Sequence, residues 1–311
     1  MDKAKLHPEI RKAVSQTPRL PFGFRPLLPL CRALYNIAAR TPLSPDVSVS
    51  RESHDGLDIL VYQSKAKMSD GAILWMFGGG HWAGKPEHLN AMAARAAREV
   101  GVPVFVPNYR LAPRHPFPAN LDDCHKAWTW LIQNARGLGI DGEQIVLAGN
   151  SAGGGLAAAL AQRLCDEGGV QPAAQCLFYP MFDDRTAADR SLDAINHFIW
   201  NNEANFAAWS AYLGSLEPGA SALPPYAAPA RRESLAGLAP SWIGMCTLDL
   251  FYEENEDYAR RLHAEGVPCE ICRVDGVPHA FEVIQPQASI AEAFQQSALA
   301  FLKKALSVDA P

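Results

Sequence analysis

Short apolar runs along the chain alternate with longer stretches in which apolar residues recur every three or four positions. The short runs predict strands, and the longer stretches predict amphipathic helices. The predicted strands cover residues 72–77, 102–107, 144–149, 173–179, 241–248 and 268–274, and the predicted helices lie near 86–99, 120–135, 152–167, 253–265 and 290–307. Such alternation predicts an α/β fold in which helices cover both faces of a mostly parallel central sheet.

Three segments depart from this alternation. Residues 47–50 and 57–62, joined through an Asp-Gly turn, predict an antiparallel hairpin at the start of the sheet. Residues 1–45 are rich in proline and aliphatic side chains, and residues 185–228 carry aromatic side chains at partly helical spacing. These aromatic residues are Phe198, Trp200, Phe206, Trp209 and Tyr212. Aromatic side chains spaced in this way usually belong to a core.

Composition narrows the class of protein. The 311 residues, 48% of them hydrophobic and 20% charged, provide enough apolar material for one large α/β core. A net charge of −5 argues against a nucleic-acid partner, which needs a concentrated basic face. No apolar run approaches the roughly 20 residues of a membrane helix, and the N-terminal residues lack the apolar core of a signal peptide. We therefore expect a cytoplasmic protein without a membrane span.

The seven cysteines are odd in number and scattered, as expected of small buried hydrophobic residues in a reducing compartment. Cys269 and Cys272 have the C-x-x-C spacing, but their strand-like surroundings indicate neighbours on a strand rather than a redox pair. No second cysteine or histidine pair stands at zinc-finger spacing, so no metal is expected.

A serine between glycines follows one predicted strand and opens the next predicted helix, in Gly149-Asn150-Ser151-Ala152-Gly153. This is the pattern of a nucleophile elbow, where glycines are needed because a Cβ would collide with the neighbouring backbone. Ser151 is therefore the candidate nucleophile. The same five residues also occur where a helix simply packs closely on a strand.

Two later residues could activate this serine, because a hydroxyl needs a base and the base needs an orienting acid. His279 lies in a Gly/Pro-rich loop after the last predicted strand, and Asp249 follows the strand predicted at 241–248. Both lie at carboxyl ends of strands, where catalytic groups of α/β sheets collect. Glu253 and Glu254 are rival acids, but they begin a predicted helix, where negative charge is favourable in itself.

A second glycine-rich turn, Phe77-Gly78-Gly79-Gly80-His81-Trp82, follows the strand predicted at 72–77. Backbone amides held in such a loop stabilise the negative charge that acyl transfer builds on a carbonyl oxygen. With the amide of Ala152, this loop could form an oxyanion hole. The overlapping residues 79–85 resemble a P-loop, but Pro86 stands where a magnesium-binding Ser or Thr is required, so no nucleotide cofactor is expected.

Several shorter motifs accompany these in a single order. They are Asn108-Tyr109-Arg110-Leu111-Ala112-Pro113, Pro116-Phe117-Pro118, Leu121-Asp122-Asp123-Cys124, Tyr179-Pro180-Met181-Phe182-Asp183-Asp184-Arg185 and Tyr212-Leu213-Gly214. Together with the elbow and the glycine loop, they make the chain resemble the hormone-sensitive-lipase-like branch of the α/β-hydrolase carboxylesterases, beyond about residue 45.

The resemblance implies an α/β-hydrolase fold, with a catalytic domain at 46–311 and a helical cap formed by 1–45 and 185–228. It implies Ser151 as nucleophile, His279 as general base and acid, Asp249 as its orienting acid, and Gly79, Gly80 and Ala152 as oxyanion donors. This chemistry needs neither cofactor nor metal, and the expected partner is a small-molecule ester. The resemblance leaves a homodimer open.

The chain departs from the family pattern at three positions. Phe77 stands where the glycine loop usually starts with histidine, and a phenyl ring cannot make the hydrogen bonds that brace that loop. Asn150 replaces the usual acidic residue before the serine, and Ala280 replaces the usual glycine after the histidine. The first departure bears on the rigidity of the oxyanion hole, and through it on activity or substrate preference.

The predicted function is a serine carboxylesterase that hydrolyses short- to medium-chain acyl esters through an acyl-serine intermediate. An amidase or a lactonase would use the same triad. A non-catalytic ligand-binding protein is a further alternative, because some plant hormone receptors resemble this branch. Those receptors lose the catalytic histidine, which is present here as His279.

Overall fold

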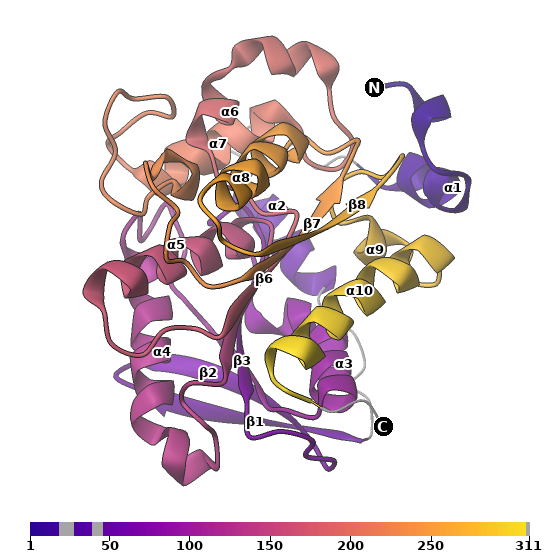
Figure 1. Ribbon diagram of the computed structural model, residues 1–311. Helices are drawn as coiled ribbons and strands as arrows, with labels where there is room; N and C mark the ends of the chain where they lie inside the picture. Colours follow the sequence, from indigo (N-terminus) through magenta and orange to yellow (C-terminus); the bar gives the residue numbers. More distant parts are fainter. Residues whose placement is uncertain (19–27, 39–45, 309–311) are drawn as a thin grey trace.

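A single twisted sheet runs through the computed structural model, which describes residues 1–18, 28–38 and 46–308 (Figure 1). Its strands, in the described residues, are β1 (Val47–His54), β2 (Leu57–Ser64), β3 (Ala72–Met76), β4 (Val104–Pro107), β5 (Ile145–Asn150), β6 (Ala174–Phe178), β7 (Ser241–Cys246) and β8 (Cys269–Val274). The spatial order is β1-β2-β4-β3-β5-β6-β7-β8. β1, β2 and β4 pair antiparallel, and the other neighbours pair parallel. The predicted hairpin and the mostly parallel sheet are confirmed.

Helices cover both faces of this sheet (Figure 1). On one face lie α3 (Asn90–Val100) and α10 (Ser289–Ala305), which contact each other. On the other lie α4 (Ala119–Leu138), α5 (Ala152–Glu167) and α8 (Tyr252–Ala264), where α4 contacts α5 and a hydrogen bond joins Gln162 to Tyr258. The helix predicted near 86–99 begins with a short 3₁₀ turn, η3 (Pro86–Leu89), before α3.

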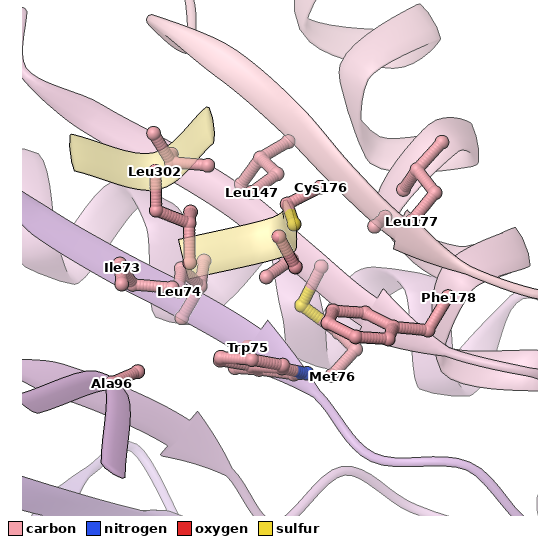
Figure 2. Close-up of a cluster of buried hydrophobic side chains, with 14 of the residues drawn as sticks. Ile73, Leu74, Trp75, Met76, Ala96, Leu147, Cys176, Leu177, Phe178 and Leu302 are labelled. Carbon is pink, nitrogen blue, oxygen red and sulfur yellow. The ribbon is translucent and has the colours of Figure 1, made fainter. Parts of the chain in front are cut away.

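The main core lies between these layers. Every residue of β3, β4, β6 and β7 is buried, and all are apolar except Gln175 of β6 and Ser241 of β7, as expected of strands covered on both faces. Figure 2 shows Leu302 of α10 close to Leu74 of β3 and Leu147 of β5, with Ala96 of α3 on the side of Ile73. This continuous core holds the carboxyl ends of the central strands in place.

A second hydrophobic cluster lies beyond the carboxyl ends of the strands and joins the segment between β6 and β7 to the glycine loop. Its elements are α2 (Leu28–Ala38), α6 (Asp184–Ala188), η4 (Arg190–Ile195) and α7 (Asn202–Leu213), while η5 (Pro229–Arg231) packs into the main core through Ala230. Trp200 and Trp209 pack there with Trp82 and Ala152, which adjoins Ser151. Most of the aromatic residues singled out in 185–228 thus pack beside the elbow in this second cluster, while Phe198 belongs to the main core.

The N-terminal segment is divided between the two clusters. η1 (Lys3–Lys5) and α1 (Pro8–Gln16) come first, and α1 contacts α9 (Phe281–Ile284), which follows the loop of His279. Cys31 and Tyr35 of α2 belong to the second cluster. Residues 19–27 and 39–45 of the predicted cap lie outside the described residues. Across the described ranges, no helix combines the length and the apolar character needed to cross a membrane.

Candidate active site

Ser151 lies at the tip of a strained turn between β5 and α5. Its backbone is left-handed, with φ 56° and ψ −123°, a conformation that costs energy and is found where surrounding structure enforces it. The flanking glycines are required sterically: a Cβ on Gly149 would lie 2.2 Å from the carbonyl oxygen of Gly153, and one on Gly153 would lie 2.2 Å from that of Met76. The predicted elbow geometry is therefore present, and it lifts Ser151 out of the regular helix.

The structure brings His279 and Asp249 to this serine. The imidazole Nε2 lies 2.9 Å from Ser151 Oγ, and the imidazole Nδ1 lies 2.7 Å from Asp249 Oδ2. All three residues are buried, with 5–8% of their surface exposed. An imidazole held between a hydroxyl and a carboxylate can accept the hydroxyl proton while the carboxylate stabilises the resulting positive charge.

The rival acids lie elsewhere. Glu253 is exposed in the first turn of α8. Glu254 is buried, but its carboxylate accepts hydrogen bonds from the backbone N–H of Phe182, at 2.6 Å, and from the hydroxyl of Thr186. Glu254 thus anchors the chain after β6 rather than the imidazole.

The loop that carries His279 is held on both sides. The amide N–H of Gly276 donates to Thr247 Oγ1 at 2.9 Å, and the carbonyl of Gly276 accepts from the amide of His7 at 2.7 Å. The imidazole itself is enclosed by the rings of Tyr179 and Phe251, whose centroids lie 4.7 and 5.2 Å from its own. These contacts restrict the imidazole to the position in which it meets Ser151.

The glycine loop lies directly against the elbow. A Cβ on Gly78 would lie 3.3 Å from the Cβ of Ser151, and Gly79 and Gly80 have φ of 127° and 58°. Among the described residues, the amides of Gly79 and Gly80 donate to no backbone carbonyl, while that of Ala152 is the first N–H of α5. The first amides of a helix have no partner within the helix. The N–H groups of Gly79, Gly80 and Ala152 are therefore all suited to stabilise an oxyanion.

Phe77 is braced by aromatic packing. Its ring stacks on that of Tyr109 at a centroid distance of 4.1 Å and an angle of 9°. The hydroxyl of Tyr109 donates a short hydrogen bond to the carbonyl of Phe77. Tyr109 thus holds the start of the loop through a contact that needs no polar side chain at position 77.

His81 joins the glycine loop to the second cluster. Its ring stacks on Tyr212 of α7 with centroids 3.9 Å apart, and its Nδ1 lies 3.3 Å from the side-chain nitrogen of Asn120. Burial lowers the pKa of His81 to about 3. The imidazole is therefore neutral at neutral pH and serves as a packing group.

This burial makes stability depend on pH. The folded chain binds fewer protons at His81 than the unfolded chain, in which histidine titrates near about 6.5, so stability falls as the pH decreases below that value. Relative to His81→Phe, which keeps a ring against Tyr212, the wild type should lose about 2 kcal/mol of unfolding free energy between pH 7 and pH 5. Urea unfolding at both pH values measures this. A difference between the two proteins that does not change with pH would contradict it.

Nothing in the described part of the chain forms a group of three or more His, Cys, Asp or Glu side chains that could hold a metal ion. Cys269 and Cys272, predicted to be neighbours on a strand, both lie on β8 as free thiols.

Residues 73–283 match the family model for the alpha/beta hydrolase fold. A solved esterase from the bacterial hormone-sensitive lipase family is 28% identical, with a TM-score of 0.81 over 96% of this chain and 99% of that one. The chain belongs to the hormone-sensitive-lipase-like branch of the α/β-hydrolase carboxylesterases.

Other relatives in this branch are esterases. Carboxylesterase NlhH of Mycobacterium tuberculosis is 33% identical over 288 residues, covering 86% of each chain. The ethyl acetate hydrolase of Pseudomonas putida is 29% identical over 240 residues, covering 76% of this chain and 74% of its own. The structure of a bacterial heroin esterase is 32% identical, with a TM-score of 0.90 over 97% of this chain and 98% of its own. The family predicted from the motifs is confirmed.

Two further groups near the imidazole have no role predicted from the sequence, although Tyr179 opens one of the motifs given above. Tyr179, which follows β6, and Glu282, in α9, form a buried pair beside His279. His197 follows η4 in a loop, although its surroundings predicted a helix. Burial lowers the pKa of His197, and the nearby carboxylate of Asp249 opposes that effect. Such residues are found only when separate elements are brought together.

Proposed function

We propose that the chain is a serine carboxylesterase that hydrolyses short- to medium-chain acyl esters through an acyl-serine intermediate. The observation that carries this proposal is the contact of one imidazole with both Ser151 Oγ and Asp249 Oδ2, at 2.9 and 2.7 Å. That contact lies at the strand-to-helix turn of a chain whose relatives include proteins named carboxylesterase and esterase. The fold alone would be compatible with other activities.

In the first half of the reaction, Ser151 Oγ attacks the ester carbonyl carbon while His279 Nε2 takes the hydroxyl proton. Asp249 keeps the proton of Nδ1 on the side away from the serine and stabilises the imidazolium. The carbonyl oxygen becomes an oxyanion, which the amides of Gly79, Gly80 and Ala152 stabilise. The imidazolium then gives its proton to the departing alcohol, and the acyl group remains on the serine.

In the second half, water takes the place of the alcohol. His279 removes a proton from the water as it attacks the acyl carbon, and the same three amides receive the second oxyanion. Return of the proton to Ser151 Oγ releases the carboxylic acid. Every proton is thus transferred by one imidazole, and the chain needs no additional reactive group.

We assign the segments 1–45 and 185–228 to a cap over this site, within a chain whose catalytic domain spans 46–311. The second hydrophobic cluster supports this assignment, because it places Trp200 and Trp209 with Ala152. A Cβ on Gly80 would lie 2.7 Å from the Trp200 ring, so the cap closes directly over the oxyanion loop. Such a cover excludes water and shapes the space for the acyl group.

An amidase or a lactonase would use the same groups, and the choice depends on the substrate. The ester proposal is favoured because relatives covering 86% and 76% of this chain are named a carboxylesterase and an ethyl acetate hydrolase. A ligand-binding protein without catalysis would have no need of the strained serine or of its contact with His279.

We also propose a cytoplasmic location and no nucleic-acid partner, and the thiols and net charge of the chain support both. All seven cysteines are free, which a reducing compartment such as the cytoplasm would maintain. The net charge of −5 is unfavourable for a nucleic-acid partner. A homodimer remains a prediction, and the outer strands of the sheet available to a second copy are β1 and β8.

The acyl-serine intermediate can be tested directly. With p-nitrophenyl acetate, we expect a rapid burst of p-nitrophenol close to one equivalent per active site, followed by slower turnover, if deacylation is the slower step. Diethyl p-nitrophenyl phosphate should block activity and leave one diethylphosphoryl group on the peptide containing Ser151, as read by mass spectrometry. The Ser151→Ala variant should remain unlabelled. Labelling at another residue with loss of activity would exclude Ser151 as the nucleophile.

A further inference from the structure

Tyr179 and Glu282 form a buried pair directly beside the imidazole of His279. The hydroxyl of Tyr179 donates a short hydrogen bond to Glu282 Oε1, and the two residues are 2% and 3% exposed. The Tyr179 ring meets the imidazole edge to face, at 4.7 Å and 66°. The Tyr179 ring thus contacts the base directly, and Glu282 follows His279 by three residues along the chain.

The direction of the hydrogen bonds leaves Glu282 as an acceptor. The indole N–H of Trp75 donates to Asn150 Oδ1 at 2.6 Å, so the amide nitrogen of Asn150 faces the hydroxyl of Tyr179, at 3.4 Å. That nitrogen can only donate, and the hydroxyl proton is therefore directed to the carboxyl of Glu282. The chain of donors runs from Trp75 to Glu282 and passes through the residue before Ser151.

The other oxygen of Glu282, Oε2, is buried and has no hydrogen-bond partner among the described residues. Burial raises the pKa of Glu282 to about 7, while the Tyr179 hydroxyl and His279 act in the opposite direction and Asp249 adds to the rise. A carboxyl that can gain or lose its charge near neutral pH therefore lies close to the catalytic base.

The titratable groups around Glu282 come from several elements. Tyr179 follows β6, Cys246 ends β7, and Asp249 and His279 lie in the loops after β7 and β8. α1 and α10 also pack near α9, and their carboxylates at Glu9 and Glu292 are bound at the surface to Ser289 and Arg95. Of the groups that act on Glu282 through their charge, Asp249 is negative and His279 is the one that can become positive.

We propose that Glu282 is a positioning residue for His279: acting with Tyr179, it holds the imidazole over Ser151 and adds a negative charge beside the imidazolium formed when the serine attacks. The proposal rests on the ester hydrolysis proposed above. Asn150 is uncharged, so Glu282 is the one acid that bonds to the Tyr179 hydroxyl among the residues that the structure describes.

Substitution can separate the effect of the negative charge of Glu282 from the effect of its hydrogen bond to Tyr179. Glu282→Gln keeps an oxygen that accepts the Tyr179 hydrogen bond but removes the charge. We expect kcat/KM at pH 8 to fall about tenfold, because the imidazolium loses an attractive charge, and the acid limb of the pH profile to move to lower pH by up to about one unit. The wild-type acid limb should contain two apparent ionisations and that of the variant only one.

Tyr179→Phe should shift the acid limb of the pH profile of kcat/KM to higher pH, opposite to Glu282→Gln. The ring remains against His279, but the hydroxyl that stabilises the ionised carboxylate is gone, so Glu282 acquires its charge only at higher pH. We expect the activity lost near pH 7 to recover toward pH 9. This variant also keeps the proposal open to refutation if Glu282→Gln does not fold.

Glu254→Gln is the matched control, since it replaces another buried glutamate that contacts Phe182 and Thr186 rather than His279. Its acid limb should coincide with that of the wild type. A uniform loss at all pH values in Glu282→Gln and Tyr179→Phe, with unmoved acid limbs, would overturn the proposal. Turnover unchanged in Ser151→Ala would instead overturn the ester mechanism itself, so the two failures are distinguishable.

Discussion

Replacing Ser151 with alanine should lower kcat for p-nitrophenyl acetate by about 10⁴- to 10⁶-fold, the range found when a nucleophilic serine is removed from a triad. The methyl group that replaces Oγ cannot form the acyl intermediate, and His279 loses the proton it is placed to accept at 2.9 Å. The amides proposed to bind the oxyanion and the proposed cap remain, so a small residual rate over that in water should persist.

The change should leave the fold intact. Alanine adds no atoms at a position where the side chain is already small and 8% exposed. The left-handed backbone of residue 151 is imposed by its surroundings, including the hydrogen bond from its amide to the carbonyl of Phe178 at 2.9 Å. Unchanged circular dichroism and urea unfolding serve as the control. Turnover within tenfold of the wild type would exclude an acyl-Ser151 mechanism.

Much of this site could be predicted because its parts are local. The elbow needs glycines at fixed distances from Ser151, and those distances are visible in the sequence: Gly149 and Gly153 each lie two residues away. The strands were predicted to within a few residues because buried parallel strands are largely apolar. The helices were predicted as closely because their apolar residues recur every three or four positions. The 3₁₀ turn at Pro86–Leu89 was predicted as part of a helix, because its apolar spacing does not distinguish the two forms.

The remainder depends on contacts between distant parts of the chain. Tyr179 and Glu282 are 103 residues apart, and although Tyr179 opens a recognisable motif, nothing in the local sequence of either residue links it to the other. Their role appears only when the end of β6 and α9 meet beside His279. The bracing of Phe77 by Tyr109 is of the same kind, since the motif predicts the loss of polar contacts but not the ring that replaces them.

Replacing Asp249 with asparagine should lower kcat/KM by about 10⁴-fold, although the two side chains have nearly the same shape. Asp249 Oδ1 accepts a hydrogen bond from the backbone N–H of Phe251 at 3.3 Å, and Oδ2 accepts from His279 Nδ1 at 2.7 Å. In the variant, the Phe251 N–H still donates and only the amide oxygen of the new asparagine can accept from it. The NH₂ group of the new side chain therefore faces His279 Nδ1.

That arrangement forces the wrong tautomer of the base. With a donor opposite Nδ1, the neutral imidazole carries its proton on Nε2, where it faces Ser151 Oγ and can no longer accept the hydroxyl proton. The triad would remain assembled and the fold stable, yet the base would be unavailable. Glu253→Gln is the control, because it removes an exposed carboxylate four residues away and should leave kcat/KM unchanged. Steady-state kinetics on both variants measure the effect, and a loss below tenfold in Asp249→Asn would show that another acid orients His279.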